Sequence, residues 1–152
     1  MPSRLWDPRG FGITEMIVVI ALIAVLAALG VPSLLTYWQT STLGAGADEL
    51  AGVLGRARAL AVTQNTTVCA QVTGTSVRFV IPSCAGTVWT GTGTDTAGVI
   101  RLSGGLQVSG GASAIFTSTG GANPGATYVV TNPRDGKARS VGVTTTGRVA
   151  VQ

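Results

Sequence analysis

The stretch GFGITE at residues 10–15, followed by MIVVIALIAVLAALGVPSLL at residues 16–35, decides the fold of this chain. Within residues 16–35 only three positions are not apolar, Gly30, Pro32 and Ser33. A helix of this length extends roughly 30 Å, which is enough to cross the hydrocarbon of a bilayer. Tyr37 and Trp38 follow directly, where an aromatic belt lies at a membrane–water boundary. The stretch therefore predicts a membrane helix, because the core helix of a small soluble domain needs a polar face.

The overall composition agrees with a chain that is not a free cytosolic protein. Its 152 residues are 45% hydrophobic and only 11% charged, whereas soluble domains carry about 25% charged residues. The same apolar content argues against disorder. The chain has no histidine, which excludes a His-based triad or metal site. Its net charge of +4 comes without any run of Lys and Arg, so the signature of a dedicated nucleic-acid binder is weak.

The remaining sequence predicts a second helical part and then a β-domain. Residues 39–65 carry an amphipathic pattern whose apolar positions recur every three or four residues: Leu43, Ala47, Leu50, Leu54, Ala57 and Ala61. Asn65 is the expected stop signal. Residues 66–152 are rich in Thr, Val, Gly and Ser, with strand-like runs at 66–72, 77–81, 99–102, 114–117, 127–131, 139–144 and 148–151. An exposed loop is expected at 90–98, and the whole pattern predicts an α+β fold with antiparallel strands.

The N-terminal order of signals resembles that of type IV pilins and pseudopilins. A short basic leader ends in Gly10, Phe11 follows, and Glu15 is the fifth residue of the segment that begins there. The resemblance implies a leader at residues 1–10 and a transmembrane or filament-core helix at residues 11–38. It implies that a prepilin peptidase cleaves between Gly10 and Phe11 and methylates the amino group of Phe11. It further implies a single-pass inner-membrane protein with a periplasmic domain, which joins other pilin subunits in a pilus or pseudopilus.

Glu15 and Pro32 each have both a functional and a simpler interpretation. A carboxylate beside hydrocarbon is unfavourable unless it is paired or protonated, so Glu15 is expected to pair with the terminal amine of a neighbouring subunit during assembly. Alternatively, Glu15 only marks the cytoplasmic boundary of a membrane anchor. Pro32 resembles the kink position of the pilin stalk helix, and alternatively it ends the membrane helix.

A different processing event is a rival interpretation of the same stretch. Ala28-Leu29-Gly30 is an acceptable site for ordinary signal peptidase, which would release a secreted β-domain that begins at Val31. Asp7 and Glu15, which precede the apolar region, weigh against this rival.

Three later stretches resemble the GspH/FimT-type minor pilins and pseudopilins. The helix end GRARALA at residues 55–61 runs into NTTVC at residues 65–69, and IFTSTG at residues 115–120 suggests a Phe-x-x-x-Gly turn. Residues 140–149 suggest the closing hairpin. The resemblance implies a small antiparallel β-sandwich packed on the second half of the helix. No enzyme is expected, because the chain lacks a histidine base, a GxSxG elbow and a P-loop, and no cofactor is implied.

Cys69 and Cys84 are the only cysteines of the chain. An even count in an oxidising compartment favours a disulfide, which would contribute about 3 kcal/mol in the chain-entropy model. The alternative is a pair of buried free thiols in two different strands. The spacing excludes a CxxC-type metal site.

DNA binding is the alternative function. Some FimT-type proteins hold DNA through a C-terminal Gly-Arg-x-Arg tail, but this chain reads Gly147-Arg148-Val149-Ala150 and lacks the second arginine. Arg134, Lys137 and Arg139 lie nearby in the sequence and would have to complement Arg148 across a hairpin. The simpler interpretation is a set of solvated charges around a turn.

Overall fold

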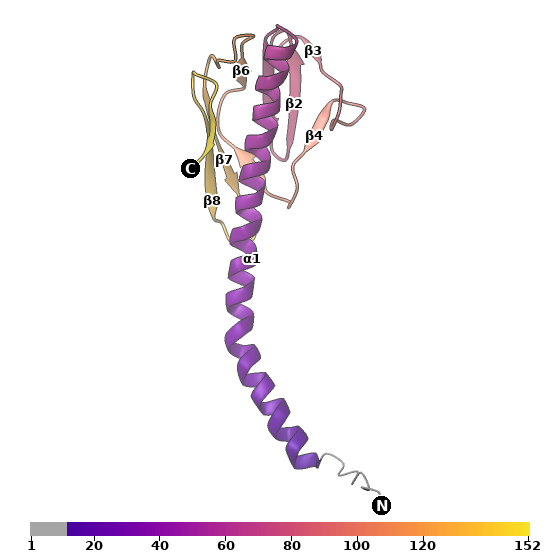
Figure 1. Ribbon diagram of the computed structural model, residues 1–152, viewed down its shortest axis with the longest axis vertical. Helices are drawn as coiled ribbons and strands as arrows, with labels where there is room; N and C mark the ends of the chain where they lie inside the picture. The colour runs from indigo at the N-terminus through magenta and orange to yellow at the C-terminus, as the bar shows by residue number, and fades with distance from the viewer. Residues whose placement is uncertain (1–11) are drawn as a thin grey trace, which may run out of the picture. The chain divides into compact units, whose positions relative to one another are not determined.

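The chain divides into two compact units. The computed structural model describes residues 12–152, and the division falls between residues 1–38 and residues 39–152. Helix α1, Ile13–Thr63, begins in the first unit and ends in the second (Figure 1). The predicted cleavage and methylation site at Gly10 and Phe11 lies outside the described residues.

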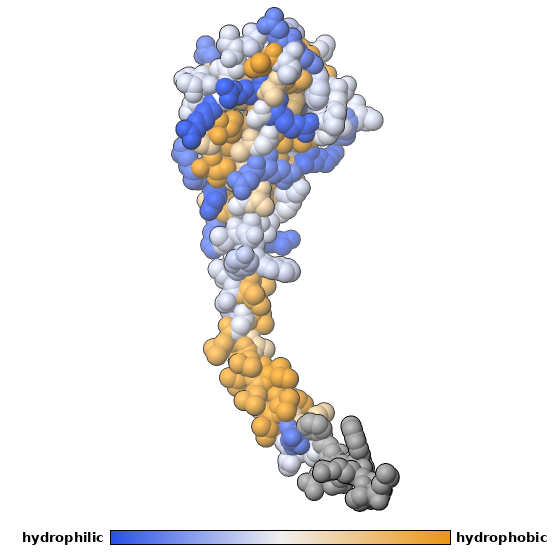
Figure 2. All heavy atoms as spheres, viewed as in Figure 1, coloured by the Kyte–Doolittle hydropathy of each residue, from blue (hydrophilic) through white to orange (hydrophobic). Residues whose placement is uncertain are grey.

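The part of α1 that belongs to the first unit is apolar on all sides. Its large side chains are exposed in the single subunit, for example Ile17 at 60% and Leu29 at 75%. Figure 2 shows them as a continuous hydrophobic surface. By its length and composition, α1 can cross a membrane. Apolar surface of this extent needs a membrane or other apolar partners around it.

Pro32 lies inside α1 and does not end the helix. Because proline has no amide hydrogen, the carbonyl of Ala28 loses its usual helical donor. The Thr36 hydroxyl donates a hydrogen bond to the Pro32 carbonyl at 3.1 Å. The alternative in which Pro32 terminates the membrane helix is therefore wrong, whereas a kink at this position stays a prediction.

In the second unit one side of α1 is buried, as its amphipathic pattern predicts. The predicted positions from Leu43 to Ala61 are all buried, and Gly46 and Val53 are buried with them. Gly46 makes room for Leu106, because a Cβ atom at Gly46 would lie 2.0 Å from the Cδ1 atom of Leu106. This side of the helix therefore belongs to the core of the domain.

The end of α1 is set by a left-handed residue at the predicted stop signal. Asn65 has a φ of 47°, and its amide donates to the Val62 carbonyl at 3.3 Å. The amide of Thr66 donates to the Ala61 carbonyl at 3.1 Å. This pair of hydrogen bonds is a Schellman motif, which satisfies the last carbonyls of the helix.

The strands of the second unit form two antiparallel sheets. The first has the order β3-β2-β1-β6, with β4 paired to the opposite half of β2 from β3. Its strands are β1 (Val68–Thr73), β2 (Ser76–Ile81), β3 (Thr87–Val88), β4 (Val99–Arg101) and β6 (Ala114–Phe116). The second has the order β5-β7-β8-β9, with strands β5 (Gln107–Ser109), β7 (Ala126–Thr131), β8 (Ala138–Val143) and β9 (Val149–Val151).

All seven predicted strands are present, with ends shifted by one or two residues, while β3 and β5 were not predicted. Both residues of β3 are exposed, and only one of the three residues of β5 is buried, so neither strand shows a pattern of apolar positions. Residues 90–98 form the expected, largely exposed loop.

The core lies between α1 and both sheets. In Figure 1, α1 lies in front of the strands, with β2 and β4 on one side of it and β7 and β8 on the other. The largest fully buried side chains come from the helix and from both sheets: Tyr128, Phe79, Phe116, Leu50, Leu54 and Leu106. The predicted α+β fold, a long helix followed by an antiparallel β-domain, is confirmed.

Candidate assembly and binding sites

Glu15 stands in the first turn of α1, where its amide donates to the Gly12 carbonyl at 3.0 Å. A carboxylate in the first turn is favoured by the positive end of the helix dipole. Glu15 is exposed, and its apolar neighbours Ile13 and Met16 are exposed as well. Among the described residues, no side chain donates to its carboxylate or forms an ion pair with it. Its carboxylate is therefore open to a group from outside the subunit.

Three stretches that carry the resemblance to minor pilins meet at the end of α1. The Arg58 Nε atom donates to the Gly120 carbonyl at 2.8 Å, which joins the helix to the loop after β6. Gly147, in the turn between β8 and β9, has a φ of 77°, and a Cβ atom there would lie 1.9 Å from the Gly120 oxygen. The helix end, the loop and the closing hairpin thus hold one another in place.

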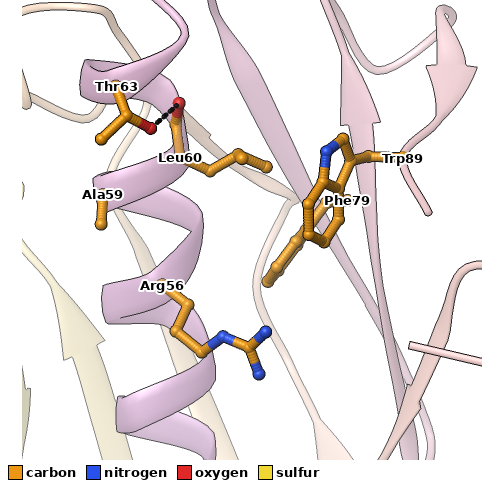
Figure 3. A pocket seen from close by; sticks show the side chains of 6 residues that line it. All are labelled: Arg56, Ala59, Leu60, Thr63, Phe79 and Trp89. Atoms are coloured by element: carbon orange, nitrogen blue, oxygen red, sulfur yellow. Dashed lines mark hydrogen bonds between the residues drawn. The ribbon is translucent and has the colours of Figure 1, made fainter. Parts of the chain in front are cut away.

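Arg56 borders a shallow groove between α1 and the first sheet (Figure 3). The groove has a volume of about 200 Å³ and is lined by Arg56, Ala59, Leu60, Thr63, Phe79 and Trp89. The Phe79 and Trp89 rings lie 6.1 Å apart between centroids, and the Arg56 guanidinium donates to the Thr92 carbonyl. The groove is mainly apolar and contains no carboxylate, thiol or histidine for acid–base or nucleophilic chemistry. Its contacts hold the loop that follows β3.

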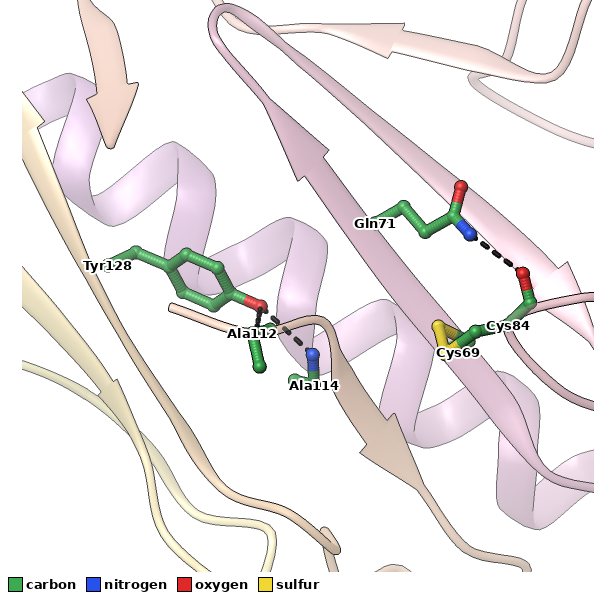
Figure 4. The surroundings of a disulfide bond; sticks show 6 residues. All are labelled: Cys69, Gln71, Cys84, Ala112, Ala114 and Tyr128. Carbon is green, nitrogen blue, oxygen red and sulfur yellow. Dashed lines mark hydrogen bonds between the residues drawn. A yellow bond between two sulfur atoms is a disulfide. The ribbon is translucent and has the colours of Figure 1, made fainter. Parts of the chain in front are cut away.

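Cys69 of β1 and Cys84 form a disulfide, with their Cα atoms 5.0 Å apart (Figure 4). The Gln71 side-chain amide donates to the Cys84 carbonyl at 2.9 Å, so the turn after β2 is attached to β1 at two points. The alternative of two free thiols is wrong.

Tyr128 of β7 is a buried titratable side chain on the other side of the same view (Figure 4). Its hydroxyl donates to the Ala112 carbonyl at 3.1 Å and accepts from the Ala114 amide at 3.0 Å. Burial raises the pKa of Tyr128, and the hydrogen bond from Ala114 opposes this shift. Because both partners are backbone groups, the hydroxyl joins β7 to the start of β6.

Solved structures with the same architecture identify the fold. The type IV minor pilin FimU of Pseudomonas aeruginosa strain PAO1 matches with a TM-score of 0.56 and 20% identity, over 72% of this chain and 92% of FimU. A second crystal form of FimU matches with a TM-score of 0.55 and 19% identity, over 76% of this chain and 92% of FimU. The chain has a pilin-like fold.

A secretion-system protein shares this pilin-like fold. The minor pseudopilin EpsH from the type 2 secretion system of Vibrio cholerae matches with a TM-score of 0.56 and 11% identity, over 72% of this chain and 95% of EpsH. No family model and no curated protein sequence matches the chain. The similarity to FimU and EpsH is thus a similarity of fold.

Of the four basic residues predicted for DNA binding, three lie together at one end of β8 and Arg148 lies at the other. Arg134 and Lys137 lie in the turn between β7 and β8, and Arg139 is the second residue of β8. Arg148 lies at the far end of β8, where its carbonyl accepts from the Thr144 amide. At 3.4 Å per residue, Arg139 and Thr144 are about 17 Å apart along the strand. Arg139 and Arg148 therefore lie at opposite ends of β8 and do not face each other across the hairpin.

Several contacts that fix the pilin-like domain have no signal in the sequence. Arg56 and Arg58 bind backbone carbonyls, which every residue carries. The Glu49 carboxylate accepts from the amide and hydroxyl of Ser103, at 2.9 and 3.1 Å.

Within residues 12–152 no cluster of three His, Cys, Asp or Glu side chains is placed to hold a metal ion.

Proposed function

We propose that this chain is a minor pilin or pseudopilin subunit. In this proposal it assembles through its N-terminal helix into a type IV pilus or into the pseudopilus of a type 2 secretion system. One observation carries the proposal: a pilin-like domain continues from a helix that is apolar on every side and whose large apolar side chains are exposed in the described residues. FimU and EpsH, which share the fold, are a minor pilin and a minor pseudopilin.

The proposed mechanism begins with removal of the leader. Prepilin peptidase cleaves between Gly10 and Phe11 and methylates the new amino terminus, while the helix stays in the inner membrane and the domain lies in the periplasm. The helix then moves from lipid into a core of similar helices. Both environments are apolar, so hydrophobicity alone does not fix the position of one helix along another. A carboxylate in such a core needs an opposite charge, and we assign the register to the pairing of Glu15 with a neighbour's terminal amine.

The test of this proposal removes the carboxylate of Glu15. Glu15→Gln keeps the shape of the side chain and removes its charge, and we expect it to enter the membrane but not the filament. Asp48→Asn is the matched control, since Asp48 is an exposed acid on α1 outside the apolar segment. Immunoblots of membrane fractions and of purified filaments give the readout. If Glu15→Gln enters filaments as well as the wild type, the register role is refuted.

The mature N-terminus separates the proposal from the rival processing event. Mass spectrometry of the chain purified from membranes should find N-methylated Phe11 as the first residue. A chain that begins at Val31 would replace the proposed subunit with a secreted β-domain. DNA binding through Arg139 and Arg148 together is not part of the proposal, because β8 separates these residues.

A further inference from the structure

The turn between β7 and β8 presents positive charge outward and turns its acid inward. The Lys137 side chain is 49% exposed, whereas that of Asp135 is 12% exposed and lies 3.9 Å from the Lys137 ammonium group. The Asp135 Oδ1 atom accepts from the Lys137 amide at 3.1 Å, and its Oδ2 atom is buried. Arg134 and Arg139 are exposed, and their guanidinium groups have no hydrogen bond or ion pair to any described residue. We call Arg134, Lys137 and Arg139 the basic end of the domain.

The backbone that carries the basic end is held in a defined conformation. Asn132 is buried, and its Oδ1 atom accepts from the Arg134 amide at 3.0 Å. The Asn132 amide donates to the Lys137 carbonyl, and the Gly136 amide donates to the Asn132 carbonyl, each at 2.9 Å. The Arg134 and Arg139 side chains therefore project from a turn whose backbone is fixed, and Lys137 pairs with Asp135 of the same turn.

The basic end lies where α1 enters the domain (Figure 1). Leu106 packs on Gly46, in the early part of α1 within this unit. The next residue, Gln107, pairs with Thr131, the last residue of β7, and the turn follows directly. Gln39, the first residue of this unit, comes immediately after the predicted membrane segment in the sequence. The basic end is thus on the side of the domain where α1 continues into the predicted membrane segment.

We propose that the basic end binds the headgroups of anionic phospholipids in the leaflet from which α1 emerges. The inference rests on the proposed function, because it needs α1 in a bilayer. Basic side chains near an anionic surface are attracted to it, and the attraction fades within a Debye length of about 8 Å at physiological salt. Contact with lipid holds the domain on the membrane before assembly and ends when α1 leaves the bilayer.

Two features favour a lipid surface over a nucleic acid as the partner. While α1 is in the bilayer, the chain connection at Gln39 limits the distance between the basic end and the headgroups, which raises their effective concentration. The turn, NPRDGK at residues 132–137, contains no aromatic side chain on which a base of a single strand would stack.

Lys137 is the only lysine of the chain, so amine labelling reports on the basic end at a single side chain. The full chain is placed in nanodiscs of phosphatidylcholine, or of equal parts phosphatidylcholine and phosphatidylglycerol, and labelled with an uncharged acetylating reagent. Peptide mass spectrometry gives the rate at Lys137. We expect labelling about fivefold slower with phosphatidylglycerol at low salt, and equal rates at high salt. Equal rates at low salt would overturn the inference.

Variants separate binding from simple closeness to the membrane. The double variant Arg134→Gln/Arg139→Gln should lose most of the protection of Lys137. Arg148→Gln should keep it, because Arg148 lies at the opposite end of β8. The same protection in both variants would show that the chain connection alone shields Lys137, and would overturn the inference.

Two further outcomes test the proposed membrane subunit and the lipid inference separately. A chain that enters neither type of nanodisc contradicts the proposed membrane subunit itself, whereas entry without lipid-dependent protection contradicts only the present inference. Protection by duplex DNA in phosphatidylcholine nanodiscs, without any effect of phosphatidylglycerol, would assign the basic end to a nucleic-acid backbone and overturn the lipid assignment.

Discussion

At the scale of single residues, Gly147 is fixed by both its conformation and its surroundings. Its φ is 77°, and a Cβ atom there would lie 1.9 Å from the backbone oxygen of Gly120. Gly136 has a similar φ of 69° but no atom within 4 Å of such a Cβ. Gly136→Ala should therefore lower the free energy of unfolding by about 1–2 kcal/mol, from backbone strain alone. Gly147→Ala should lower it by about 3 kcal/mol or more, since backbone must also move.

Urea denaturation of the full chain in detergent compares the two glycine variants. Equal losses of stability would show that the close approach of Gly147 to Gly120 has no energetic weight.

The buried Tyr128 makes the free energy of unfolding depend on pH in the alkaline range. Burial raises its pKa above the ordinary value of 10.0, so the unfolded chain loses this proton at a lower pH than the folded chain. The stability that the protonated Tyr128 hydroxyl contributes is fully present below pH 10.0 and is lost as the pH rises above that value. Tyr128→Phe should lower the free energy of unfolding by about 1–3 kcal/mol at neutral pH, because two backbone groups lose their partner. It should also flatten the alkaline decline.

Urea denaturation at a series of pH values tests the role of Tyr128. Tyr37, the other tyrosine of the chain, is 68% exposed and provides the unchanged background. Parallel alkaline curves for the wild type and Tyr128→Phe would contradict the assignment.

At the scale of elements, the spacing of apolar residues predicted which side of α1 is buried. The positions from Leu43 to Ala61 repeat with the helical period, so the buried side of α1 followed from the sequence, and Asn65 marked its end. Strand β5 was missed because only Val108 of its three residues is buried. The separation of Arg139 from Arg148 was missed for a different reason. It depends on the register of β8 and β9, which pairs Val141 with Val151, and adjacency in sequence does not give that register.

The disulfide attaches the turn after β2 to strand β1. Reduction should lower the free energy of unfolding by about 3 kcal/mol, the value expected for a closed loop of this size. Thermal unfolding with and without reductant measures the change. The double variant Cys69→Ala/Cys84→Ala is the control and should not respond to reductant. A wild-type domain that is fully reduced yet equally stable would contradict this expectation.

At the scale of the whole molecule, the two units are built for different surroundings. Residues 12–38 leave their apolar side chains exposed, whereas the buried positions of α1 begin only at Leu43. The hydrophobic excess of the composition therefore has two origins, the apolar helix and the core of the domain. The domain core uses no side chain that precedes Leu43, so its stability should not depend on the apolar segment.

This independence predicts how truncated chains behave. A chain of residues 39–152 keeps every buried position of α1 and should be a water-soluble monomer that unfolds cooperatively, with the stability of the full chain in detergent. A chain of residues 55–152 lacks Leu43, Leu50 and Leu54 and should not fold, because Leu→Ala changes in a core already remove about 2–5 kcal/mol each. Circular dichroism and urea denaturation measure both chains. If residues 39–152 fail to fold, the apolar helix contributes to the domain itself and is more than an anchor.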